Sequence, residues 1–452
     1  MTEVTLVYPY FQPPKDKSIF RFPPLGLGYL AAYLKEHRRS VALVDCTFLS
    51  REEALGKVRA SNPRIIGVYA MFSMKRHALE MARLLRGDCE LLVAGGPLPT
   101  TQPGDFLQDF DLAVLGEGEE TLLDLLYAWE GAAALSEVRG VAYREGGEVK
   151  LSHPRRRVQN LDNLPFPARE LFDNDAYKRF YWERHGYTIT SMITSRGCPF
   201  NCDFCSQPVF GGQFRMRSPG NVVDEVEAVL QLGYHRIWFA DDCFTLDRSR
   251  LIDICNEIIR RGIRVDWECL SRVDTIDRGL AGKMREAGCV RVFFGVESGN
   301  DAVLALMNKR VTTAQASEAV TAAKKVGLQV GAFFILGYPG ENDETVLDTV
   351  RFASALPLDY LSFTLPYPIP GTPLHERVKD RMVDDNGKEP RRLRFAEHTL
   401  LYRSSFSEAK LTFALLKGMV QFNLRKYLKT RGYNLVGKPL EKLTDFLFKH
   451  LR

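Results

Sequence analysis

The sequence predicts an α/β fold with a Rossmann-like N-terminal domain, a partial (βα)6 barrel of the TIM type and a helical C-terminal region. Three observations support this prediction. Short apolar runs alternate with helical patterns in residues 1–150, and a second alternating series covers 187–375. The second series has six repeats, whereas a closed barrel has eight. Apolar residues at helical spacing then recur within 376–452.

The first alternating series predicts five strands separated by helices, which together form a parallel sheet covered on both faces. The expected strands are 4–8, 41–45, 65–69, 91–94 and 112–115, and the expected helices are 25–37 and 121–129. Residues 151–186 differ in character. The segment Leu164-Pro165-Phe166-Pro167 and the basic run 155–157 are typical of a linker with little regular structure.

The second alternating series predicts six strands, and barrels of this type carry their functional residues at the C-terminal strand ends. The expected strands are 188–194, 236–240, 265–270, 290–295, 329–336 and 360–365, and the expected helices include 222–232, 250–261 and 313–326.

The C-terminal region is basic. Residues 376–452 hold 18 Lys and Arg against 9 Asp and Glu, and 408–429 has helical apolar spacing. Two interpretations stay open: a helical cap with a basic, solvated face, or a docking surface for an anionic partner or a protein substrate.

The chain as a whole carries a formal charge of only +5, which is too small to indicate a nucleic-acid partner. No apolar run reaches the roughly 18–20 residues of a membrane span, and the first residues lack the features of a secretion signal. We therefore expect a cytoplasmic protein.

Three of the nine cysteines lie within eight residues. Cys198, Cys202 and Cys205 occur in Arg196-Gly197-Cys198-Pro199-Phe200-Asn201-Cys202-Asp203-Phe204-Cys205, with C-x3-C-x2-C spacing. Three thiolates at this spacing can ligate three irons of a [4Fe–4S] cluster and leave the fourth iron open. Zinc would need a fourth ligand, and the nearest downstream histidine is the distant His235. Three structural cysteines in a tight turn are the other alternative.

On these residues the chain resembles the radical S-adenosylmethionine (radical SAM) superfamily. The resemblance implies that the three cysteines hold the cluster and that the open iron binds the amino and carboxylate groups of SAM. It also implies that Phe204, the aromatic residue before the last cysteine, lies near the adenine. Such chemistry requires an electron donor such as ferredoxin or flavodoxin and an anaerobic setting.

Other predicted strand ends fit the same resemblance. Asp241 and Asp242 are expected at the SAM amino group, although they could instead cap the following helix. Arg272 is expected to pair with the SAM carboxylate or to form a structural ion pair. Glu297 and Ser298, in a G-x-E-S-G segment, are expected to approach SAM. Two further candidates are Gly337, which would permit close approach to the adenine, and Tyr367, a weak candidate for facing the substrate.

Three N-terminal features together resemble the cobalamin-binding domain that precedes many radical SAM domains. They are the segment 22–30, the pair Gly95-Gly96 after a strand, and Gly116-Glu117-Gly118 after another strand. The resemblance implies that these glycines and Glu117 contact the cofactor. It further implies that Tyr69, Met71, Phe72 and Ser73 lie in the loop under the cobalt.

One departure from that resemblance concerns the cobalt ligand. Many cobalamin domains carry an Asp-x-His-x-x-Gly segment whose histidine ligates cobalt, but this chain has Asp45-Cys46-Thr47-Phe48 there. The resemblance therefore implies base-off binding without a histidine ligand.

The expected activity is that of a cobalamin-dependent radical SAM C-methyltransferase. One SAM would methylate cobalamin to methylcobalamin, and a second would give the 5′-deoxyadenosyl radical that activates an sp3 carbon. A peptide substrate is expected, with a glutamine of methyl-coenzyme M reductase as the first candidate for this post-translational modification.

Three alternatives remain: natural-product or lipid methylases, a radical SAM cyclase or rearrangement enzyme of the tetrapyrrole type, and a non-enzymatic cobalamin or SAM sensor. A sensor has no need for a redox cluster with an open iron, so the cysteine motif argues against it.

Overall fold

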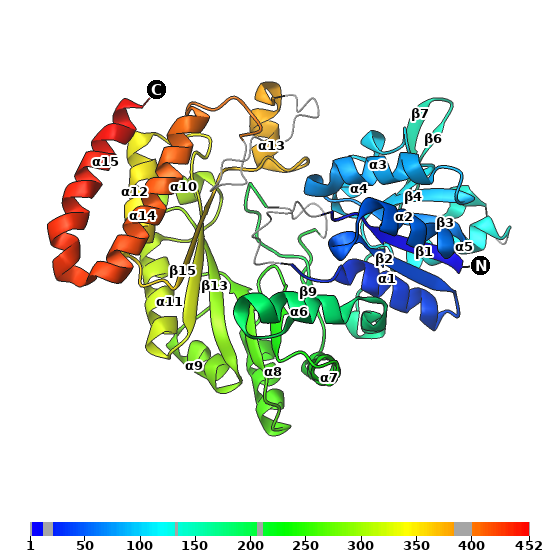
Figure 1. The fold of residues 1–452 in the computed structure, drawn as a ribbon, viewed down its shortest axis with the longest axis horizontal. Helices are drawn as coiled ribbons and strands as arrows, with labels where there is room; N and C mark the ends of the chain where they lie inside the picture. Colours follow the sequence, from blue (N-terminus) through cyan, green and yellow to red (C-terminus); the bar gives the residue numbers. More distant parts are fainter. Residues whose placement is uncertain (1, 12–20, 132–133, 206–210, 384–399, 452) are drawn as a thin grey trace. The chain divides into compact units, whose positions relative to one another are not determined.

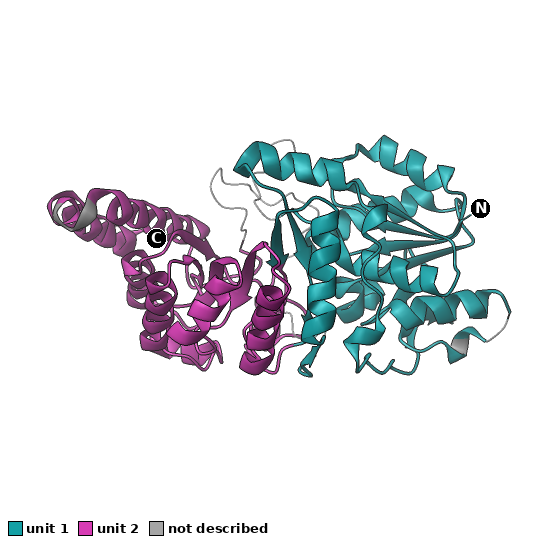
Figure 2. Ribbon diagram, turned by 90° about the horizontal axis from the view of Figure 1, so that it is seen from below, with its two compact units in different colours: residues 1–197, 208–238 teal, residues 198–207, 239–452 magenta. Residues whose placement is uncertain are grey.

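Two compact units make up the chain. The computed structural model describes residues 2–11, 21–131, 134–205, 211–383 and 400–451. Unit 1 comprises 1–197 and 208–238, and unit 2 comprises 198–207 and 239–452 (Figure 2).

Unit 1 contains a seven-stranded sheet with the order β2-β1-β3-β4-β5-β6-β7. Its first five strands are parallel, and the last two form an antiparallel hairpin at the edge. The strands are β1 (Thr2–Tyr8), β2 (Val41–Asp45), β3 (Pro63–Tyr69), β4 (Leu91–Gly95), β5 (Leu112–Val114), β6 (Val141–Glu145) and β7 (Glu148–Leu151). All five predicted strands are therefore confirmed, and the hairpin is an addition.

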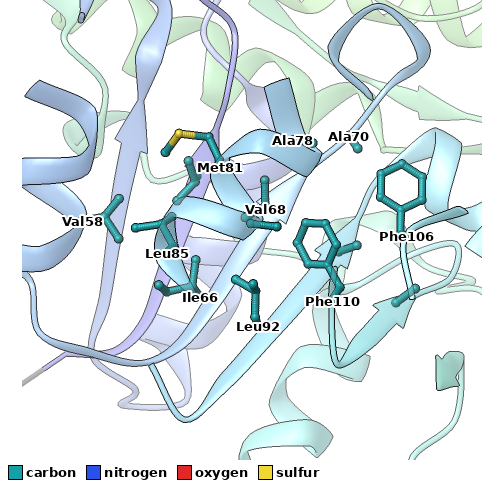
Figure 3. Close-up of a cluster of buried hydrophobic side chains, with 14 of the residues drawn as sticks. Val58, Ile66, Val68, Ala70, Ala78, Met81, Leu85, Leu92, Phe106 and Phe110 are labelled. Atoms are coloured by element: carbon teal, nitrogen blue, oxygen red, sulfur yellow. The ribbon is translucent and has the colours of Figure 1, made fainter. Parts of the chain in front are cut away.

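Helices cover both faces of this sheet, as predicted, because successive strand residues point to opposite sides. Ile65 joins the core under α1 and α5, whereas the next residue, Ile66, joins the core under α2 and α3 (Figure 3). The helices are α1 (Leu25–Glu36), α2 (Arg51–Ala60), α3 (Lys75–Leu85), α4 (Pro97–Thr101) and α5 (Glu119–Trp129).

Unit 1 continues beyond this sheet with α6 (Asn174–His185), β8 (Ile189–Met192), β9 (Ser195–Arg196), β10 (Arg215–Met216), α7 (Pro219–Gln231) and β11 (Arg236–Phe239). β9 and β10 pair antiparallel, and β8 neighbours β11.

Helix α6 corrects the expectation that residues 151–186 have little regular structure. Asp173 caps its first turn by accepting from the Ala176 N–H, and Gly186 ends it in the left-handed conformation at φ 72°. Tyr177, Phe180 and Tyr181 provide an apolar stripe that is buried. The prolines at 165 and 167 predict irregular structure for their own part of the segment, whereas the helical signals lie further along the chain.

Unit 2 contains four parallel strands in the order β12-β13-β14-β15. They are β12 (Asp266–Ser271), β13 (Cys289–Glu297), β14 (Gln329–Ile335) and β15 (Tyr360–Thr364). The helices between and after them are α8 (Arg248–Arg260), α9 (Arg278–Glu286), α10 (Asp301–Leu306), α11 (Thr313–Lys325), α12 (Asp343–Ala355) and α13 (Pro373–Val378). With β8 and β11 of unit 1, all six strands of the second predicted series are present.

The C-terminal region is helical, as predicted. α14 (Glu408–Gly432) and α15 (Lys438–His450) form a hairpin that packs on α12, and a π-helical turn at Tyr433–Gly437 joins them (Figure 1). Across the described residues, no helix is both long and apolar enough to cross a bilayer.

Candidate functional site

The three clustered cysteines lie on one loop that follows β9. Cys198, Cys202 and Cys205 form no disulfide and are partly exposed, and the Cys205 N–H donates to the Cys202 carbonyl oxygen at 3.1 Å. No group of three cysteine, histidine or acidic side chains in the described residues is already arranged to hold a metal ion. The thiols must therefore turn toward one another when a cluster binds.

Asp203 anchors the cysteine loop within unit 2. Its N–H donates to the Met307 carbonyl oxygen at 3.0 Å, and its carbonyl oxygen accepts from the Leu374 N–H at 2.9 Å. Its carboxylate accepts from Arg377 at 2.8 Å. These three contacts hold the backbone between Cys202 and Cys205 against the segments that end α10 and begin α13.

Two buried cations lie beside Cys202. The Arg272 Nη1 donates to the Cys202 sulfur at 3.8 Å, and the guanidinium lies 3.6 Å from the centre of the Phe200 ring. Arg272 Nη2 also donates to the Lys309 carbonyl oxygen at 2.9 Å. Arg272 is 5% exposed and Lys309 is 6% exposed, so solvent screens their charges only weakly.

Each of these cations has a carboxylate partner. Asp274 accepts from Nε and Nη2 of Arg272, both at 2.9 Å, and Glu297 accepts from Lys309 Nζ at 3.0 Å. Arg272 therefore forms the structural ion pair that the sequence left open as an alternative. Burial acts to lower the pKa of Lys309, but the charges of Glu297 and Cys202 outweigh burial and raise it.

The cysteine loop fits an anionic iron–sulfur cluster. Three thiols that form no disulfide belong to one short anchored segment, and cations stabilise the thiolate form of cysteine, which is the form that ligates iron. Two buried cations beside Cys202 provide that stabilisation.

Asp241 and Asp242 follow β11, and the structure answers the question of helix capping. The side chain that caps α8 is Asp247, which accepts from the Arg250 N–H at 2.8 Å. Asp241 is buried. Partial desolvation and then the charge of Asp241 raise the pKa of Asp242. The charge of Asp242 also helps to raise the pKa of Cys198, where burial is the larger cause, so this acid lies near the cysteine loop.

The G-x-E-S-G segment at the end of β13 packs closely on α12. Glu297 adopts a left-handed backbone conformation at φ 72°, which is uncommon outside glycine. Ser298 is fully buried and its hydroxyl lies 2.9 Å from that of Thr349. A Cβ at Gly299 would lie 2.5 Å from the Phe352 Cβ. Packing therefore accounts for Ser298 and Gly299, and their contact with SAM stays a prediction.

Gly337 begins the loop after β14, and two constraints require a glycine there. Its φ is 83°, and a Cβ would lie 2.7 Å from a Leu411 methyl group of α14. Glu341 closes the loop by accepting from the N–H groups of Gly337 at 2.7 Å and Tyr338 at 2.8 Å. Burial raises the pKa of Glu341 to about 7.

The two aromatic candidates lie in different surroundings. Phe204 is partly buried against an apolar cluster that includes Met307 and Tyr338, and Lys309 Nζ lies 5.9 Å from its ring centre. Tyr367, on the loop after β15, is 36% exposed. Phe204 therefore packs the cysteine loop against this apolar cluster, whereas Tyr367 lies at the surface of unit 2.

The glycines of the N-terminal sheet edge are of two kinds. At Gly95 and Gly116, a Cβ would meet no atom within 4 Å, so open space adjoins the backbone. At Gly96, φ is 109° and a Cβ would lie 2.7 Å from the Ala70 carbonyl oxygen. At Gly118, Leu30 and Val114 come within 3.2–3.3 Å. Gly95 and Gly116 thus fit close approach by a ligand, whereas Gly96 and Gly118 serve internal packing.

The loop after β3 presents apolar side chains at the same edge. Met71 is 36% exposed and Phe72 is 37% exposed, Ser73 is exposed, and Tyr69 is half-buried. Exposed large apolar side chains beside glycine-lined open space suit the flat, largely apolar face of a corrin ring. The residues at this edge therefore fit cobalamin.

Glu117 differs from the other predicted cobalamin residues. Its carboxylate accepts from Arg215 Nη2 at 2.6 Å and lies 3.5 Å from Arg196 Nη1. Burial acts to raise the pKa of Glu117, but these guanidinium groups hold it below its usual range. The side chain is a structural anchor between the sheet edge and the β9–β10 hairpin.

The carboxylate of Asp45, at the end of β2, is also engaged in hydrogen bonds within the protein. It accepts from the Thr47 N–H at 3.0 Å and from the Tyr177 hydroxyl at 2.6 Å. The following residues, Cys46 to Phe48, form a short 3-10 turn that contains no histidine. This loop therefore offers no imidazole to a cobalt ion.

Four residues of the site were missed by sequence reasoning: Phe200, Asp274, Lys309 and Glu341. Phe200 and Asp274 lie within two residues of predicted positions, so a search of neighbouring charges and aromatics would have found them. Lys309 is twelve residues from Glu297, and no local pattern links the two.

Two family models match the chain. The model of the radical SAM superfamily matches residues 192–353, and the model of the B12 binding domain matches residues 16–126. The first match contains the cysteine loop with Arg272 and Glu297. The second contains the loops that follow β3, β4 and β5.

Similarity to individual proteins extends over most of the chain. "Uncharacterized methyltransferase PH0819" of Pyrococcus horikoshii is 36% identical over 378 residues, which are 80% of this chain and 81% of that protein. "Anaerobic magnesium-protoporphyrin IX monomethyl ester cyclase" of Cereibacter sphaeroides is 28% identical over 400 residues, which are 84% of this chain and 64% of that protein. The solved structure of the cobalamin-dependent S-adenosylmethionine radical enzyme OxsB shares the fold, with a TM-score of 0.77 and 21% identity over 100% of this chain and 72% of that one.

The first prediction tests whether the buried ion pair between Lys309 and Glu297 stabilises the fold beside Cys202. Lys309→Met should lower the free energy of unfolding by about 3–5 kcal/mol, because it leaves the Glu297 carboxylate buried without its partner. Urea unfolding followed by circular dichroism measures the change. Lys325→Met, at an exposed position of α11, should stay within about 0.5 kcal/mol of the parent.

A second variant separates charge from packing. Adding Glu297→Gln to Lys309→Met should recover part of the loss, since no buried charge is then left unpaired. An equal loss in the single and double variants would contradict this account of the pair.

Proposed function

Because the chain belongs to the family of radical SAM enzymes that carry a B12-binding domain, we propose that it is a cobalamin-dependent C-methyltransferase acting on an unactivated sp3 carbon. When bound, the [4Fe–4S] cluster supplies the electron that splits SAM into methionine and a 5′-deoxyadenosyl radical, and cobalamin supplies the methyl group.

One observation carries this proposal: a single chain offers an anchored loop of three cysteines that form no disulfide and a glycine-lined, apolar sheet edge. The first suits radical generation and the second suits a corrin. A radical route is required for this class of substrate, because an unactivated C–H bond has no useful acidity for a general base.

In this proposal the protein's own residues bind and orient. Cys198, Cys202 and Cys205 hold the cluster, and Asp203 fixes the path of their loop. Gly95 and Gly116 admit the corrin ring against the backbone. Holding several reactants in register accounts for much of the rate enhancement in such sites.

The magnesium-protoporphyrin cyclase relative makes a cyclase the second candidate. The two reactions leave different products of SAM. Methyl transfer from one SAM leaves S-adenosylhomocysteine, and radical formation from another leaves 5′-deoxyadenosine. A cyclase makes 5′-deoxyadenosine without S-adenosylhomocysteine.

Cys202→Ala should therefore abolish both activities. In anaerobically reconstituted protein, iron should fall from about four atoms per chain to background, and 5′-deoxyadenosine formation with a reductant should be lost. Cys89→Ala, at a partly exposed cysteine of unit 1, should keep both. The parent protein should release equal amounts of S-adenosylhomocysteine and 5′-deoxyadenosine per methyl group transferred. Release of 5′-deoxyadenosine alone would favour the cyclase, and retained iron in Cys202→Ala would refute the ligand assignment.

Gly95→Leu tests the cobalamin edge. The variant should fold, since its side chain enters open space, but it should bind about tenfold less cobalamin because that space would hold the ring. Absorbance after reconstitution with hydroxocobalamin and desalting measures the bound cofactor.

Gly56→Leu is the matched control for this variant. Gly56 is exposed on α2 and also has no atom within 4 Å of a Cβ, so the control should bind cobalamin like the parent. A parent protein that stays colourless, or Gly95→Leu with full occupancy, would refute the assignment.

For the substrate we propose a peptide carbon, with a glutamine of methyl-coenzyme M reductase as the first target. Residues 376–437, which precede α15, support a polypeptide, because they hold 14 Lys and Arg against 7 Asp and Glu and this surplus would attract an acidic segment. Incubation of the reconstituted enzyme with a peptide from that protein should add about 14 Da, the mass of a methylene group, to the glutamine residue in tandem mass spectra. A peptide that gains no mass while 5′-deoxyadenosine accumulates would exclude this substrate and leave the methyltransferase proposal standing.

A further inference from the structure

Helix α15 has its polar face turned inward and its apolar face turned outward. Glu441, Asp445 and Phe448 face α12 and α14, and the carboxylates of the first two are largely buried, with 15% of each side chain exposed. The opposite face presents Leu443 at 55% exposure and Phe446 at 59%. An ordinary surface helix shows the reverse arrangement.

The two carboxylates that face inward form hydrogen bonds and ion pairs with neighbouring side chains. Glu441 accepts from the Tyr433 hydroxyl at 2.6 Å and lies 3.4 Å from Arg425 Nη2. Asp445 pairs with Lys417 at 2.7 Å and with Arg351 at 2.5 Å. These ion pairs fix the rotation of α15 about its axis, so its apolar stripe is held outward.

The apolar surface continues along the hairpin. Exposed large apolar residues on α14, the turn and α15 are Leu416, Met419, Val420, Tyr427, Leu435, Val436, Leu443, Phe446, Leu447 and Leu451. Tyr427 and Leu435 are more than 70% exposed, at 73% and 72%. So many exposed large apolar side chains on one helical hairpin mark an interaction site.

The charges on the outer surface of α15 are all positive. In residues 438–451, which the structure describes in full, the exposed charged side chains are Lys438, Lys442 and Lys449. Lys449 pairs with Glu344, whereas no ion pair is found for Lys438 or Lys442 in the described part of the chain. Apolar residues edged by lysines are the pattern of a helix that lies on an anionic lipid surface.

A basic cavity opens at the hairpin turn. Lys324, Arg425, Lys426 and Lys438 are among its lining residues. Its one acid is Asp359, whose carboxylate pairs with Lys324 at 2.8 Å. Because Arg425 pairs with Glu441, the charges left for a ligand are those of Lys426 and Lys438, which suit an anionic lipid headgroup beside the apolar residues.

We infer that the α14–α15 hairpin docks on an anionic membrane surface, with Leu443 and Phe446 in the headgroup region and Lys438 and Lys442 toward the lipid phosphates. Two other occupants fit less well. A second copy would bring lysines against lysines, with no exposed acid on α15 to balance them. A bound helical peptide needs an apolar groove, whereas Leu443 and Phe446 do not line the cavity at the turn, whose walls also carry four cationic side chains.

This inference bears on the two sequence interpretations of the C-terminal region, both of which stay open. The outer face of α15 is apolar with a basic edge. Residues 384–399, outside the described residues, hold four Lys and Arg and four Asp and Glu, so the positive surplus of the C-terminal region lies in 376–383 and 400–452.

Vesicle flotation with the full-length, reconstituted protein tests the inference without any turnover, so its result is independent of the proposed function. The protein should float with phosphatidylcholine vesicles that contain phosphatidylserine and stay behind with phosphatidylcholine alone. High salt should weaken the binding, because it screens the lysines. Leu443→Gln combined with Phe446→Gln should reduce the bound fraction about tenfold or more.

Two controls accompany this variant. Leu84→Gln, at a 41% exposed leucine of α3, should bind like the parent. Lys438→Gln combined with Lys442→Gln should lower binding to anionic vesicles and leave thermal unfolding unchanged, which keeps the test valid if the apolar variant misfolds.

Three results would overturn the inference. The first is a parent protein that does not float with anionic vesicles. The second is a concentration-dependent dimer, without flotation, that the double Gln variant abolishes, because it would assign the face to a second copy. The third is binding to poly-glutamate but not to vesicles, because it would assign the face to an acidic polypeptide.

Discussion

Parallel strand pairing is the constraint on which both candidate sites depend. In a parallel sheet every strand must end at the same edge, so residues far apart in sequence meet there without any specific attraction. In unit 1 this edge gathers the loops after β3, β4 and β5, and in unit 2 it gathers those after β12, β13 and β14. The backbone hydrogen bonds of the sheets therefore position Arg272, Glu297 and the glycines of the sheet edge, whereas Asp203 anchors the cysteine loop itself.

In unit 2, two buried ion pairs fix the positions of the charged side chains beside the cysteine loop. Arg272 and Lys309 would each carry an uncompensated charge in a site of low dielectric if Asp274 and Glu297 were absent. With those partners present, the two cations hold fixed positions beside Cys202, and the guanidinium of Arg272 donates to its sulfur. Such a preorganised field acts without reorganising when a ligand binds.

The strands and the cysteine ligands were predictable because their signals are local. Apolar runs of β-branched residues marked every parallel strand to within a few residues, and the spacing of Cys198, Cys202 and Cys205 is itself the ligand signal. The roles of Glu117 and Gly337 were not predictable, because Arg215 and Leu411 reach them from distant parts of the chain. Helical periodicity likewise shows that α15 has two faces but does not say which one turns inward.

The pairing of Glu117 with Arg196 and Arg215 has a consequence for dissecting the protein. A fragment that ended after the first sheet, near residue 150, would leave the Glu117 carboxylate without either guanidinium and would also separate Asp45 from Tyr177. A piece that ended after the β9–β10 hairpin would still separate the buried Arg169 from Glu225 of α7, so the smallest piece that keeps these polar groups satisfied runs through α7. Glu117 thus ties the sheet edge that fits the corrin to Arg196, which directly precedes the cysteine loop, and recombining this domain with a foreign barrel would require grafting α6, the hairpin and α7 along with it.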